Sequence, residues 1–384
     1  MNVHFLIDNI YTKKFINFML ESNLISDSYF IIITYGEVKY VKQLENCENI
    51  KIINWSGWIK FFKSNEYKMI KDYLLGNNKI FIHFLSSSMY KILFLNKPTN
   101  VYWVLWGADF YNDLNLELFQ EKTRNILDEL GSRKKRNKFK GWVNQRVKQN
   151  VIKNMSHICF WNYYDYKLIK EVYSTNADFI EFFYPLDISN NYNYERNIEY
   201  NPNYNYKKKF KFVIQVGNSA DPSNNHIEIL EYLSKLESKD FAIFVPLSYG
   251  QNNGYTKIII EKGFELLGER FIPLSEYLDL KTYNFILSQV DVAIMNHNRQ
   301  QGVGNIVTLL NMGKKVYVNE SITTYNDFKV KGISLYGINN DLFQAKSIES
   351  IVYYDKDINE RNIKNIYKNF NDELCKQNII NLIK

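Results

Sequence analysis

Short apolar runs alternate with amphipathic stretches along the first half of the chain. The stretch at residues 66–75 repeats its apolar positions at helical spacing and ends at a Gly-Asn pair. Runs rich in β-branched and aromatic side chains, which are typical of buried strands, cover residues 3–7, 29–34, 79–84 and 101–105. Strands that alternate with helices in this way predict a parallel sheet with crossover helices.

The second half of the chain repeats this alternation after a polar break. Residues 187–206 are mostly Asn, Tyr, Ser and Glu without a usable period, which indicates a linker. Beyond Ser347 the pattern is mainly helical, and before it strand-like runs cover residues 210–216, 241–245, 290–295 and 315–318. The sequence therefore predicts an α/β protein with two Rossmann-like domains. Its parts are a first domain at 1–186, a linker at 187–209, a second domain at 210–346 and a helical tail at 347–384 that packs back on the first domain.

The most ordered unit of the second half runs from residue 287 to residue 320. It has the order strand, polar turn, helix and strand, so its turn lies where open α/β sheets bind ligands. The amides that open the helix suit an anion, and Arg299 brings a fixed positive charge. Gly302 and Gly304 permit close approach to the backbone. A phosphate site and a plain tight turn with an exposed arginine fit this pattern equally well, and the turn is neither a Walker A loop nor the dinucleotide fingerprint.

A second turn of this kind follows the strand at residues 210–216. It is dense in glycine, asparagine and serine, and it precedes a helix that begins near Ile227. A further polar loop follows the next strand. The candidate contacts for the phosphates, base or hydroxyl groups of a ligand are Gly217, Asn218, Ser219, Asn224, Tyr249, Arg299, Gln300, Gln301, Gly302 and Gly304.

Three polar side chains in the first half stand where predicted strands end. They are Asp109, Asp8 and His83, and each also has a structural interpretation. Asp8 would cap the next helix, His83 would be a hydrogen-bonded core histidine, and Asp109 would shape a turn. Asp109 is surrounded by aromatic residues, and partial desolvation would raise its pKa and make it a better general base.

The positive charge of the chain is concentrated in one segment. The net charge is +7, yet nine Lys or Arg residues and no acid fall between Gly131 and Asn154, so the remainder carries 7 − 9 = −2. Aromatic and apolar residues are interleaved, which predicts a basic amphipathic segment at residues 131–155 with a helix from about Gly141. Such a segment suits an anionic membrane surface or nucleic acid, or is a solvated charged helix.

Other compositional features narrow the class of protein. The 384 residues and 46% hydrophobic content are sufficient for two domain cores. Three widely separated cysteines indicate reduced thiols without metal-ligand spacing, and no apolar run reaches the ~20 residues of a membrane span. We therefore expect a soluble or peripheral cytoplasmic protein. The one Asp-x-Asp sequence, at residues 355–357, is interpreted as a solvated turn.

Several ordered motifs resemble one enzyme family. VGNSADPSNNHIEIL at 216–230 and RQQGVG at 299–304 are the most specific, and others are GFELL at 263–267, LSEYLDLKTYNFIL at 274–287, HFLID at 4–8, WGADFY at 106–111 and FFYP at 182–185. Together they resemble glycosyltransferase family 56, the family of the TDP-N-acetylfucosamine:lipid II N-acetylfucosaminyltransferase of enterobacterial common antigen synthesis. The likeness is dense in the second half and thin in the first, where the segment after Asp8 departs from the family pattern. Asn296-His297 is a further departure.

The resemblance implies the GT-B fold, in which two Rossmann-like domains face each other across a cleft. It implies transfer of a 4-acetamido-4,6-dideoxyhexose from a TDP-sugar to a polyprenyl-diphosphate-linked saccharide, in enterobacterial common antigen or O-antigen type synthesis. The expected enzyme needs no metal or other cofactor, and it is peripheral at the cytoplasmic face of the inner membrane, held there by residues 133–153. Asp109, Asp8 and His83 would be the catalytic candidates.

Three alternatives stay open at this point. A non-catalytic nucleotide-sugar-binding protein would share the same turns, and a pyruvyl- or phospho-group transferase could use a GT-B-like scaffold. A nucleic-acid-binding protein would use the basic segment, but no helix-turn-helix or RNA-binding signature accompanies it.

Overall fold

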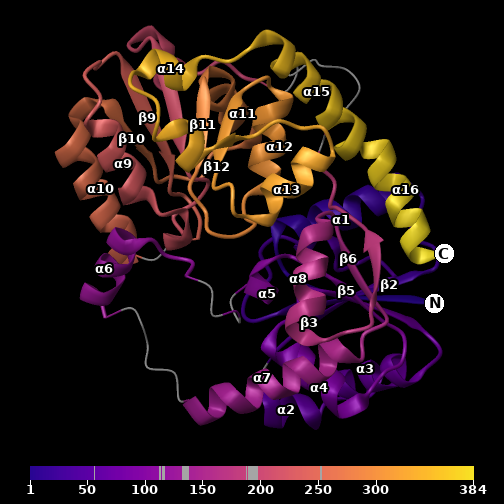
Figure 1. The fold of residues 1–384 in the computed structure, drawn as a ribbon. Helices are drawn as coiled ribbons and strands as arrows, with labels where there is room; N and C mark the ends of the chain where they lie inside the picture. The colour runs from indigo at the N-terminus through magenta and orange to yellow at the C-terminus, as the bar shows by residue number, and fades with distance from the viewer. Residues whose placement is uncertain are drawn as a thin grey trace. The chain divides into compact units, whose positions relative to one another are not determined.

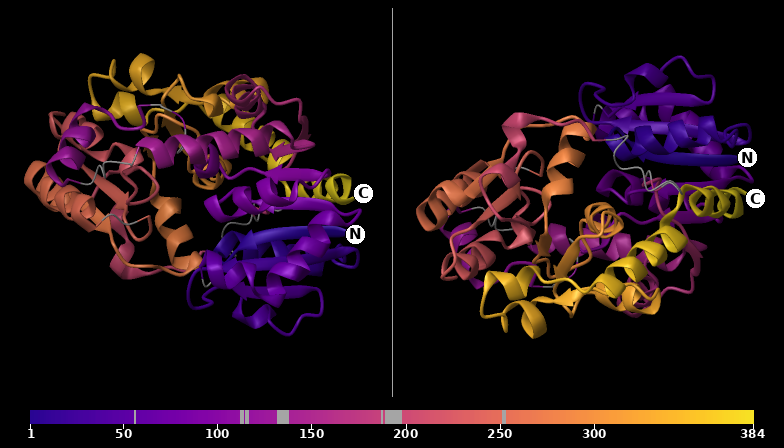
Figure 2. Two further views of the ribbon diagram at one scale, coloured as in Figure 1. Left: turned by 90° about the horizontal axis from the view of Figure 1, so that it is seen from below. Right: turned by 90° about the horizontal axis from the view of Figure 1, so that it is seen from above.

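The computed structural model of the protein divides into two compact units. Unit 1 comprises Met1–Leu114, Arg136–Asp187 and Asp372–Lys384, and unit 2 comprises Asn115–Lys135 and Ile188–Asn371. Both termini therefore belong to unit 1 (Figure 2). The structure describes residues 1–55, 57–111, 114, 117–131, 138–186, 188, 198–250 and 253–384.

Unit 1 is built on a seven-stranded parallel sheet with the strand order β3-β2-β1-β4-β5-β6-β7 (Figure 1). Central strands such as β1 are almost wholly buried, which explains their near-continuous apolar sequence. The strands are β1 (Asn2–Ile7), β2 (Ser28–Thr34), β3 (Ile50–Asn54), β4 (Lys79–His83), β5 (Val101–Val104), β6 (His157–Phe160) and β7 (Asp178–Glu181).

Helices connect the strands of unit 1 as the alternating pattern predicted. Asn9 caps the first helix, because its side-chain oxygen accepts the backbone amides of Tyr11 and Thr12. The helices are α1 (Ile10–Glu21), α2 (Trp58–Phe62), α3 (Asn65–Leu75), α4 (Ser87–Asn96), α5 (Ala108–Tyr111), α7 (Lys138–Lys153), α8 (Tyr163–Tyr173) and α16 (Asp372–Ile383). Among the described residues, no helix combines the length and the apolar character that crossing a membrane requires.

Unit 2 contains a six-stranded parallel sheet with the strand order β10-β9-β8-β11-β12-β13. Adjacent strands β8 and β11 therefore present the turns that follow them at the same edge of the sheet. The strands are β8 (Phe212–Val216), β9 (Phe241–Pro246), β10 (Phe271–Leu274), β11 (Val292–Met295), β12 (Lys315–Val318) and β13 (Tyr336–Gly337).

The helices of unit 2 cover this sheet (Figure 1). They are α6 (Glu121–Glu129), α9 (His226–Ser234), α10 (Asn253–Leu267), α11 (Leu280–Gln289), α12 (Val303–Asn311), α13 (Thr323–Val330), α14 (Ile348–Val352) and α15 (Lys356–Phe370). The remaining turns are the 3₁₀ helices Lys42–Leu44 in unit 1 and Pro202–Tyr204, Tyr206–Lys208, Pro222–Asn224 and Gly268–Arg270 in unit 2, with a π-helical turn at Ile338–Leu342.

The units differ from the predicted domain boundaries at two places. Residues 115–135 were assigned to the first domain, yet they belong to unit 2, where the apolar core includes Leu127. Of the tail at residues 347–384, only α16 belongs to unit 1, where the Cys375 thiol lies 3.4 Å from the carbonyl oxygen of Phe183. Long-range packing decides both assignments, and hydrophobic periodicity carries no information on the partner of an apolar face.

The predicted linker and basic segment are described only in part. Residues 198–209 of the linker belong to unit 2, where the backbone amides of Tyr206 and Lys207 donate to Gln289 Oε1. Residues 187 and 189–197 lie outside the described residues, as do residues 132–137 of the basic segment. Its helix, α7, begins at Lys138, three residues before the predicted start.

Candidate functional site

Two glycine turns stand side by side at the carboxyl ends of β8 and β11. Gly217 has φ +70° and Gly302 has φ +67°, a left-handed conformation that favours glycine. A Cβ atom on Gly217 would lie 2.7 Å from Asn224 Oδ1, and one on Gly302 would lie 3.0 Å from Asn218 Cγ. Both turns therefore need glycine for conformation and for space.

Side-chain hydrogen bonds join the two turns. Asn224 Oδ1 accepts the backbone amide of Asn218 at 2.8 Å and pairs with His297 Nε2 at 2.9 Å, so that this nitrogen carries the proton. Ser223 Oγ donates to Gln301 Oε1 at 2.6 Å, and Gln301 Nε2 reaches Asn218 Oδ1 at 3.4 Å. Five side chains from the two loops thus form one network. We call this network, with the adjoining His226, Arg299 and Gln300, the cradle.

The histidines of the cradle are neutral at physiological pH. Burial lowers the pKa of His226 to about 4, and burial together with the charge of Arg299 lowers the pKa of His297 to about 3. Within the described part of the chain, His297 Nδ1 and Gln300 Oε1 are buried acceptors without a hydrogen-bond partner. Buried polar atoms normally find partners, so these two acceptors indicate a place for a ligand donor or a water.

The start of α12 is suited to an anion. Gly302 occupies its N-cap without a side-chain hydrogen bond, Gly304 lies in its first turn, and that turn carries no acid. Half-buried Arg299 lies in the loop that leads into α12, shortly before Gly302. The start of α9 carries Glu228, so α12 offers the more favourable field for a phosphate group.

Tyr249 contributes an aromatic ring to the same edge of the sheet. Its side chain is 49% exposed, while its hydroxyl accepts Asn218 Nδ2 at 2.7 Å. The carbonyl oxygen of Tyr249 also accepts the amide of Ala220 at 2.8 Å. The hydroxyl and the backbone of Tyr249 are therefore both held by hydrogen bonds, while about half of the residue is exposed.

A segment that the sequence analysis did not connect with the site packs beside the cradle. Residues 117–131, here called the α6 strap, include α6 and belong to unit 2. Thr123 is buried and donates its amide and hydroxyl to the carboxylate of Glu228 at 2.9 and 2.8 Å. Leu127 packs in the core beside Ile227 of α9. These contacts fix the strap against the helix that follows the first glycine turn.

Gln120 connects the α6 strap to the cradle. Its Nε2 donates to Asn296 Oδ1 at 2.9 Å, and Asn296 Nδ2 donates back to its Oε1 at 3.2 Å. The backbone amide of Gln120 also donates to Asn225 Oδ1 at 2.8 Å. Asn296 directly precedes His297, so Gln120 supports one wall of the cradle. Only Asn296-His297, the departure from the family pattern, marked this wall in the sequence.

Asp109 in unit 1 is an anchored carboxylate. Its Oδ2 accepts the amide of Leu85 at 2.9 Å and Trp103 Nε1 at 2.8 Å, and its Oδ1 accepts the amide of Trp106 at 3.0 Å. Desolvation raises the pKa of Asp109, and these hydrogen bonds with the charge of Lys148 oppose the rise in part. The raised pKa fits the predicted base, whereas the occupied oxygens fit a positioning role.

A strained residue lies next to the atoms that Asp109 holds. Phe84 has φ +74°, which is unusual for a bulky side chain, and it links His83 to the Leu85 amide that Asp109 accepts. Asp109 thus ties the loop after β4 to the loop after β5. Strain of this kind clusters at functional sites.

His83 is the middle of a buried hydrogen-bond chain. The indole Nε1 of Trp106 donates to the Tyr184 hydroxyl at 2.6 Å, which leaves that hydroxyl free to donate to His83 Nδ1 at 2.6 Å. His83 Nε2 then pairs with His4 Nδ1 at 3.0 Å. Burial lowers the pKa of His83 well below its ordinary value. Both ring nitrogens are engaged, as expected of a satisfied core histidine that positions Tyr184.

Asp8 holds a loop and does not cap the helix that follows it. Its carboxylate accepts the amides of Lys39, Tyr40 and Val41 at 2.6, 3.1 and 3.2 Å. The alternative that Asp8 caps the next helix is wrong, because the neighbouring Asn9 makes that cap. In the tail, Asp355 is the N-cap of α15 and its carboxylate accepts two backbone amides.

The sequence also matches a known family over residues 161–377, more than half of the chain. The description of that family is 4-alpha-L-fucosyltransferase, glycosyl transferase group 56. This protein belongs to glycosyl transferase group 56. The resemblance carried by the motifs is confirmed, and the group 56 protein is a hexosyltransferase. The matched residues include the whole cradle, whereas Asp8, His83 and Asp109 lie outside them.

Solved structures show the same fold over the whole chain. A glycosyltransferase from Rickettsia africae is 18% identical with a TM-score of 0.65, and 100% of this chain and 98% of that chain are covered. HepE from Anabaena, solved with UDP and glucose, is 11% identical with a TM-score of 0.63 and coverage of 100% and 99%. Sucrose-phosphate synthase from Thermosynechococcus elongatus is 10% identical with a TM-score of 0.60 and coverage of 100% and 98%. The predicted GT-B fold is confirmed.

Proposed function

We propose that the group 56 protein takes its sugar from a nucleoside diphosphate and that the cradle holds the diphosphate. The observation that carries this proposal is the start of α12, where Gly302 leaves the amides without a side-chain cap beside Arg299. The two bare acceptors, His297 Nδ1 and Gln300 Oε1, would meet donors on the ligand such as hydroxyl groups. A UDP complex of the similarly folded HepE supports a nucleotide ligand for this fold.

The electrostatics of the cradle suit the departure of a diphosphate. As the bond between the anomeric carbon and the diphosphate oxygen breaks, negative charge grows on the leaving group. The α12 amides and the Arg299 guanidinium would stabilise that charge where it develops. Because His226 and His297 are neutral, the positive charge in the cradle comes from Arg299. These groups can take the role that a divalent metal has in other glycosyltransferases.

The acceptor would react in unit 1. Its hydroxyl oxygen forms the new bond to the anomeric carbon, and in an inverting reaction a base takes the hydroxyl proton. Asp109 is the first candidate for that base, since burial raises the pKa of its carboxyl, and Asp8 and His83 follow. The hydrogen bonds to Asp8 and His83 favour positioning roles for those two residues.

The finer proposal names the substrates. The donor is a TDP-sugar carrying a 4-acetamido-4,6-dideoxyhexose, and the acceptor is a polyprenyl-diphosphate-linked saccharide for a cell-surface polysaccharide. The motif resemblance and the family match support it. A lipid-linked acceptor requires the protein to work at a membrane, so the basic segment at residues 133–153 would hold it at the cytoplasmic face of the inner membrane.

Calorimetry with TDP, UDP and their sugars tests the donor proposal directly. Arg299→Ala should weaken diphosphate binding about tenfold or more, because a charge-assisted hydrogen bond is lost. Arg361→Ala, on the exposed side of α15, is the matched control. If none of these compounds binds, or Arg299→Ala binds them as the unchanged protein does, the cradle is not a diphosphate site.

Sedimentation with vesicles tests the membrane proposal. Reversing the charge at Lys134, Lys135 and Lys138 to Glu should release the protein from vesicles of phosphatidylglycerol and leave donor binding intact. High salt should have the same effect. Unchanged co-sedimentation of the variant would contradict a role for this segment.

A further inference from the structure

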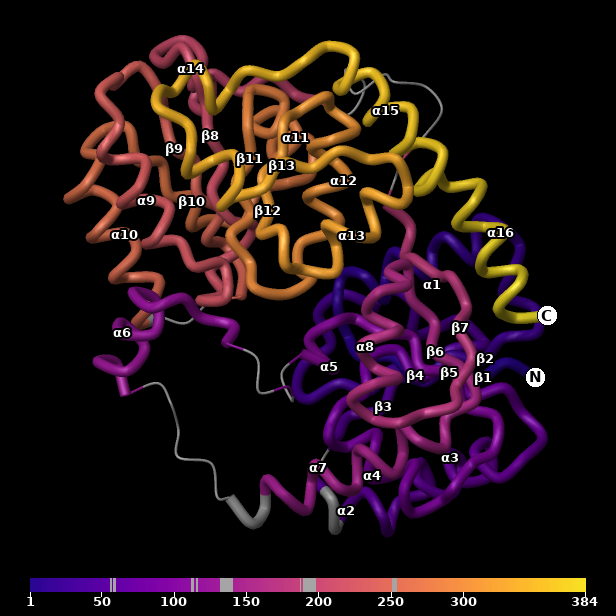
Figure 3. Tube along the Cα trace, viewed as in Figure 1, coloured from indigo at the N-terminus to yellow at the C-terminus, as the bar shows by residue number. Residues whose placement is uncertain are grey.

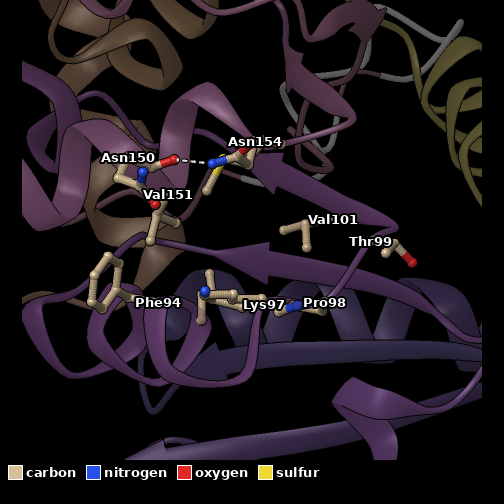
Figure 4. A pocket seen from close by; sticks show the side chains of 10 residues that line it. Phe94, Lys97, Pro98, Thr99, Val101, Asn150, Val151 and Asn154 are labelled. Atoms are coloured by element: carbon tan, nitrogen blue, oxygen red, sulfur yellow. Dashed lines mark hydrogen bonds between the residues drawn. The ribbon is translucent and has the colours of Figure 1, made fainter.

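A cavity of about 490 Å³ lies in unit 1 at the last turns of α4 and α7 (Figure 4). Its buried lining is apolar and consists of Leu93, Val101, Val151 and Met155. Its remaining lining residues are polar or more exposed, namely Phe94, Lys97, Pro98, Thr99, Asn150 and Asn154. An apolar floor with a polar, cationic rim suits an amphiphile with an anionic head.

The cavity is separate from the sites described above. Val101 is the first residue of β5, and Met155 stands two residues before β6 begins. The cavity therefore opens at the amino edge of the unit 1 sheet, whereas His83 and Asp109 follow the carboxyl ends of their strands. A molecule bound here would not occupy the place of the reacting acceptor hydroxyl.

The two segments that line the cavity contain no acidic residues. No Asp or Glu occurs in residues 73–108 or in residues 130–164, the two segments that supply all the lining side chains. Lys97 stands on the rim, and Lys91 and Lys153 lie on the two helices. The two lining segments thus offer positive and no negative side chains to an anionic group.

Three carbonyl groups near the ends of α4 and α7 accept hydrogen bonds from residues of the same helix end. Free carbonyl groups at a helix C-terminus would repel an anion. Here Asn96 Nδ2 donates to the carbonyl of Ile92 at 2.8 Å, and Asn154 Nδ2 donates to that of Asn150 at 2.7 Å. The amide of Lys97, in a left-handed conformation with φ +49°, donates to the carbonyl of Leu93. The ammonium group of Lys97 is therefore the principal charge on the rim.

Exposed apolar side chains also lie on the two helices that contribute to the cavity. α4 and α7 pack against each other (Figure 3). Leu95 on α4 is 58% exposed and Trp142 on α7 is 54% exposed, and Phe94 and Val143 are exposed as well. Apolar side chains beside lysines and away from acids are the pattern of a surface that meets an anionic membrane.

We propose that this cavity binds one anionic phospholipid, with its phosphate at Lys97 and the first carbons of its acyl chains on the apolar floor. The proposal deepens the membrane association proposed above and rests on it for the source of the lipid. It adds a specific lipid site at the carboxyl end of the basic segment, away in the sequence from its lysines and arginines at residues 133–140. Lipid binding at this cavity does not depend on sugar transfer.

Titration with a soluble short-chain lipid tests the cavity without a membrane. Dihexanoyl phosphatidylglycerol, kept below its micelle concentration, should bind the full chain with saturation at one molecule, measured by calorimetry. Lys97→Asn should bind it about tenfold more weakly, because the charge is lost while asparagine tolerates the left-handed backbone. Lys257→Asn in unit 2, where the lysine side chain is 77% exposed, is the matched control and should bind normally.

A second variant tests the floor of the cavity. Val151→Trp should fill it and abolish saturable binding, and an unchanged circular dichroism spectrum would show that the variant is folded. Normal binding by both Lys97→Asn and Val151→Trp would overturn the proposal. Equal affinity for glycerol phosphate would overturn it too, since a free anion would then suffice. Equal affinity for dihexanoyl phosphatidylcholine would exclude an anionic specificity.

Vesicle sedimentation separates the two membrane proposals. In one outcome, the charge reversal at Lys134, Lys135 and Lys138 leaves vesicle binding intact while Lys97→Asn abolishes soluble-lipid binding. This result would support lipid binding by the cavity and contradict the role of the basic segment. In the other outcome, the charge reversal releases the protein and soluble lipid shows no saturable binding. This result would support membrane binding by the basic segment and contradict lipid binding by the cavity.

Discussion

Gln120 and Asn296 exchange two side-chain amide hydrogen bonds, of 2.9 and 3.2 Å, although 176 residues separate them in the chain. The pair joins the α6 strap to the residue that precedes His297. One wall of the cradle is therefore supported by the short first segment of unit 2, which unit 1 residues separate from the rest of unit 2 along the chain. Under the proposal that the cradle holds the donor, this arrangement makes Gln120 a positioning residue for that site.

Replacing Gln120 tests that role. In Gln120→Ala, the Oδ1 and Nδ2 atoms of Asn296 both lose their hydrogen bond to Gln120. Each lost hydrogen bond contributes about 1 kcal/mol. We expect the Kd for TDP, and the KM for the donor sugar, to rise about fivefold or more while kcat changes less. Gln377→Ala, on the exposed side of α16, is the control. A donor KM equal to that of the unchanged protein would show that the strap only stabilises the fold.

The glycine turns should be intolerant of side chains. Gly217→Ala forces a Cβ into a left-handed residue and within 2.7 Å of Asn224 Oδ1, which costs about 1–3 kcal/mol of stability and displaces the cradle network. We expect a lower melting temperature and weaker TDP binding. Gly36→Ala, where nothing lies within 4 Å of the added atom, should change neither quantity. Normal TDP binding by folded Gly217→Ala would contradict the proposed approach of the phosphate to this turn.

Asp109→Asn distinguishes an anchor from a base. The amide group of asparagine would turn a donor toward one of the N–H groups of Leu85, Trp103 or Trp106, so we expect a loss of about 1–3 kcal/mol in the free energy of unfolding. Burial raises the pKa of Asp109, so its contribution to stability falls as pH rises from the ordinary carboxyl range through the raised pKa. The free energy of unfolding of Asp109→Asn should lack this pH dependence. Chemical denaturation across that range measures both effects.

The activity of the same variant completes the test. A base that is lost without structural change would leave stability intact and remove the acid limb of the profile of kcat against pH. An anchor that is lost would lower stability and raise the KM for the acceptor. An Asp109→Asn protein with unchanged stability and unchanged turnover would exclude both roles.

The buried histidines of the cradle should make unit 2 sensitive to acid. Their ordinary pKa is 6.5, and burial lowers the pKa of His226 to about 4 and of His297 to about 3. Below pH 6.5 the unfolded chain therefore binds protons that the folded protein does not, and stability falls as pH falls, by about 1.4 kcal/mol per pH unit for each such histidine. His297→Gln should reduce this slope between pH 6 and 5 by about 1.4 kcal/mol per pH unit, because one fewer proton is bound on unfolding. An unchanged slope would show that His297 titrates in the folded protein.

His157 provides the comparison for this measurement. Burial also lowers its pKa, but its side chain is only partly buried, at the start of β6 in unit 1. His157→Gln should therefore change the slope less than His297→Gln does. The donor affinity of the unchanged protein should stay constant between pH 7 and 8, because both cradle histidines are neutral throughout that range.

The sequence by itself determined the elements and the turns of both sheets. Apolar runs such as residues 290–295 predicted β11 because a parallel strand is buried on both faces. The turns at Gly217 and Gly302 were predictable because glycine is the residue that a left-handed, crowded position requires. Ordered motifs around these turns were sufficient to indicate the family and the fold.

Only the tertiary structure decided which groups meet. No local pattern places Gln120 against Asn296, since an amphipathic helix such as α6 does not specify which core receives its apolar face. In the same way, Asp8 and Asp109 look like available acids in the sequence, and their engagement by backbone amides and an indole follows from loops that the fold brings together. Local conformation follows from neighbouring residues along the chain, whereas the partners of a polar group depend on contacts that long-range packing alone creates.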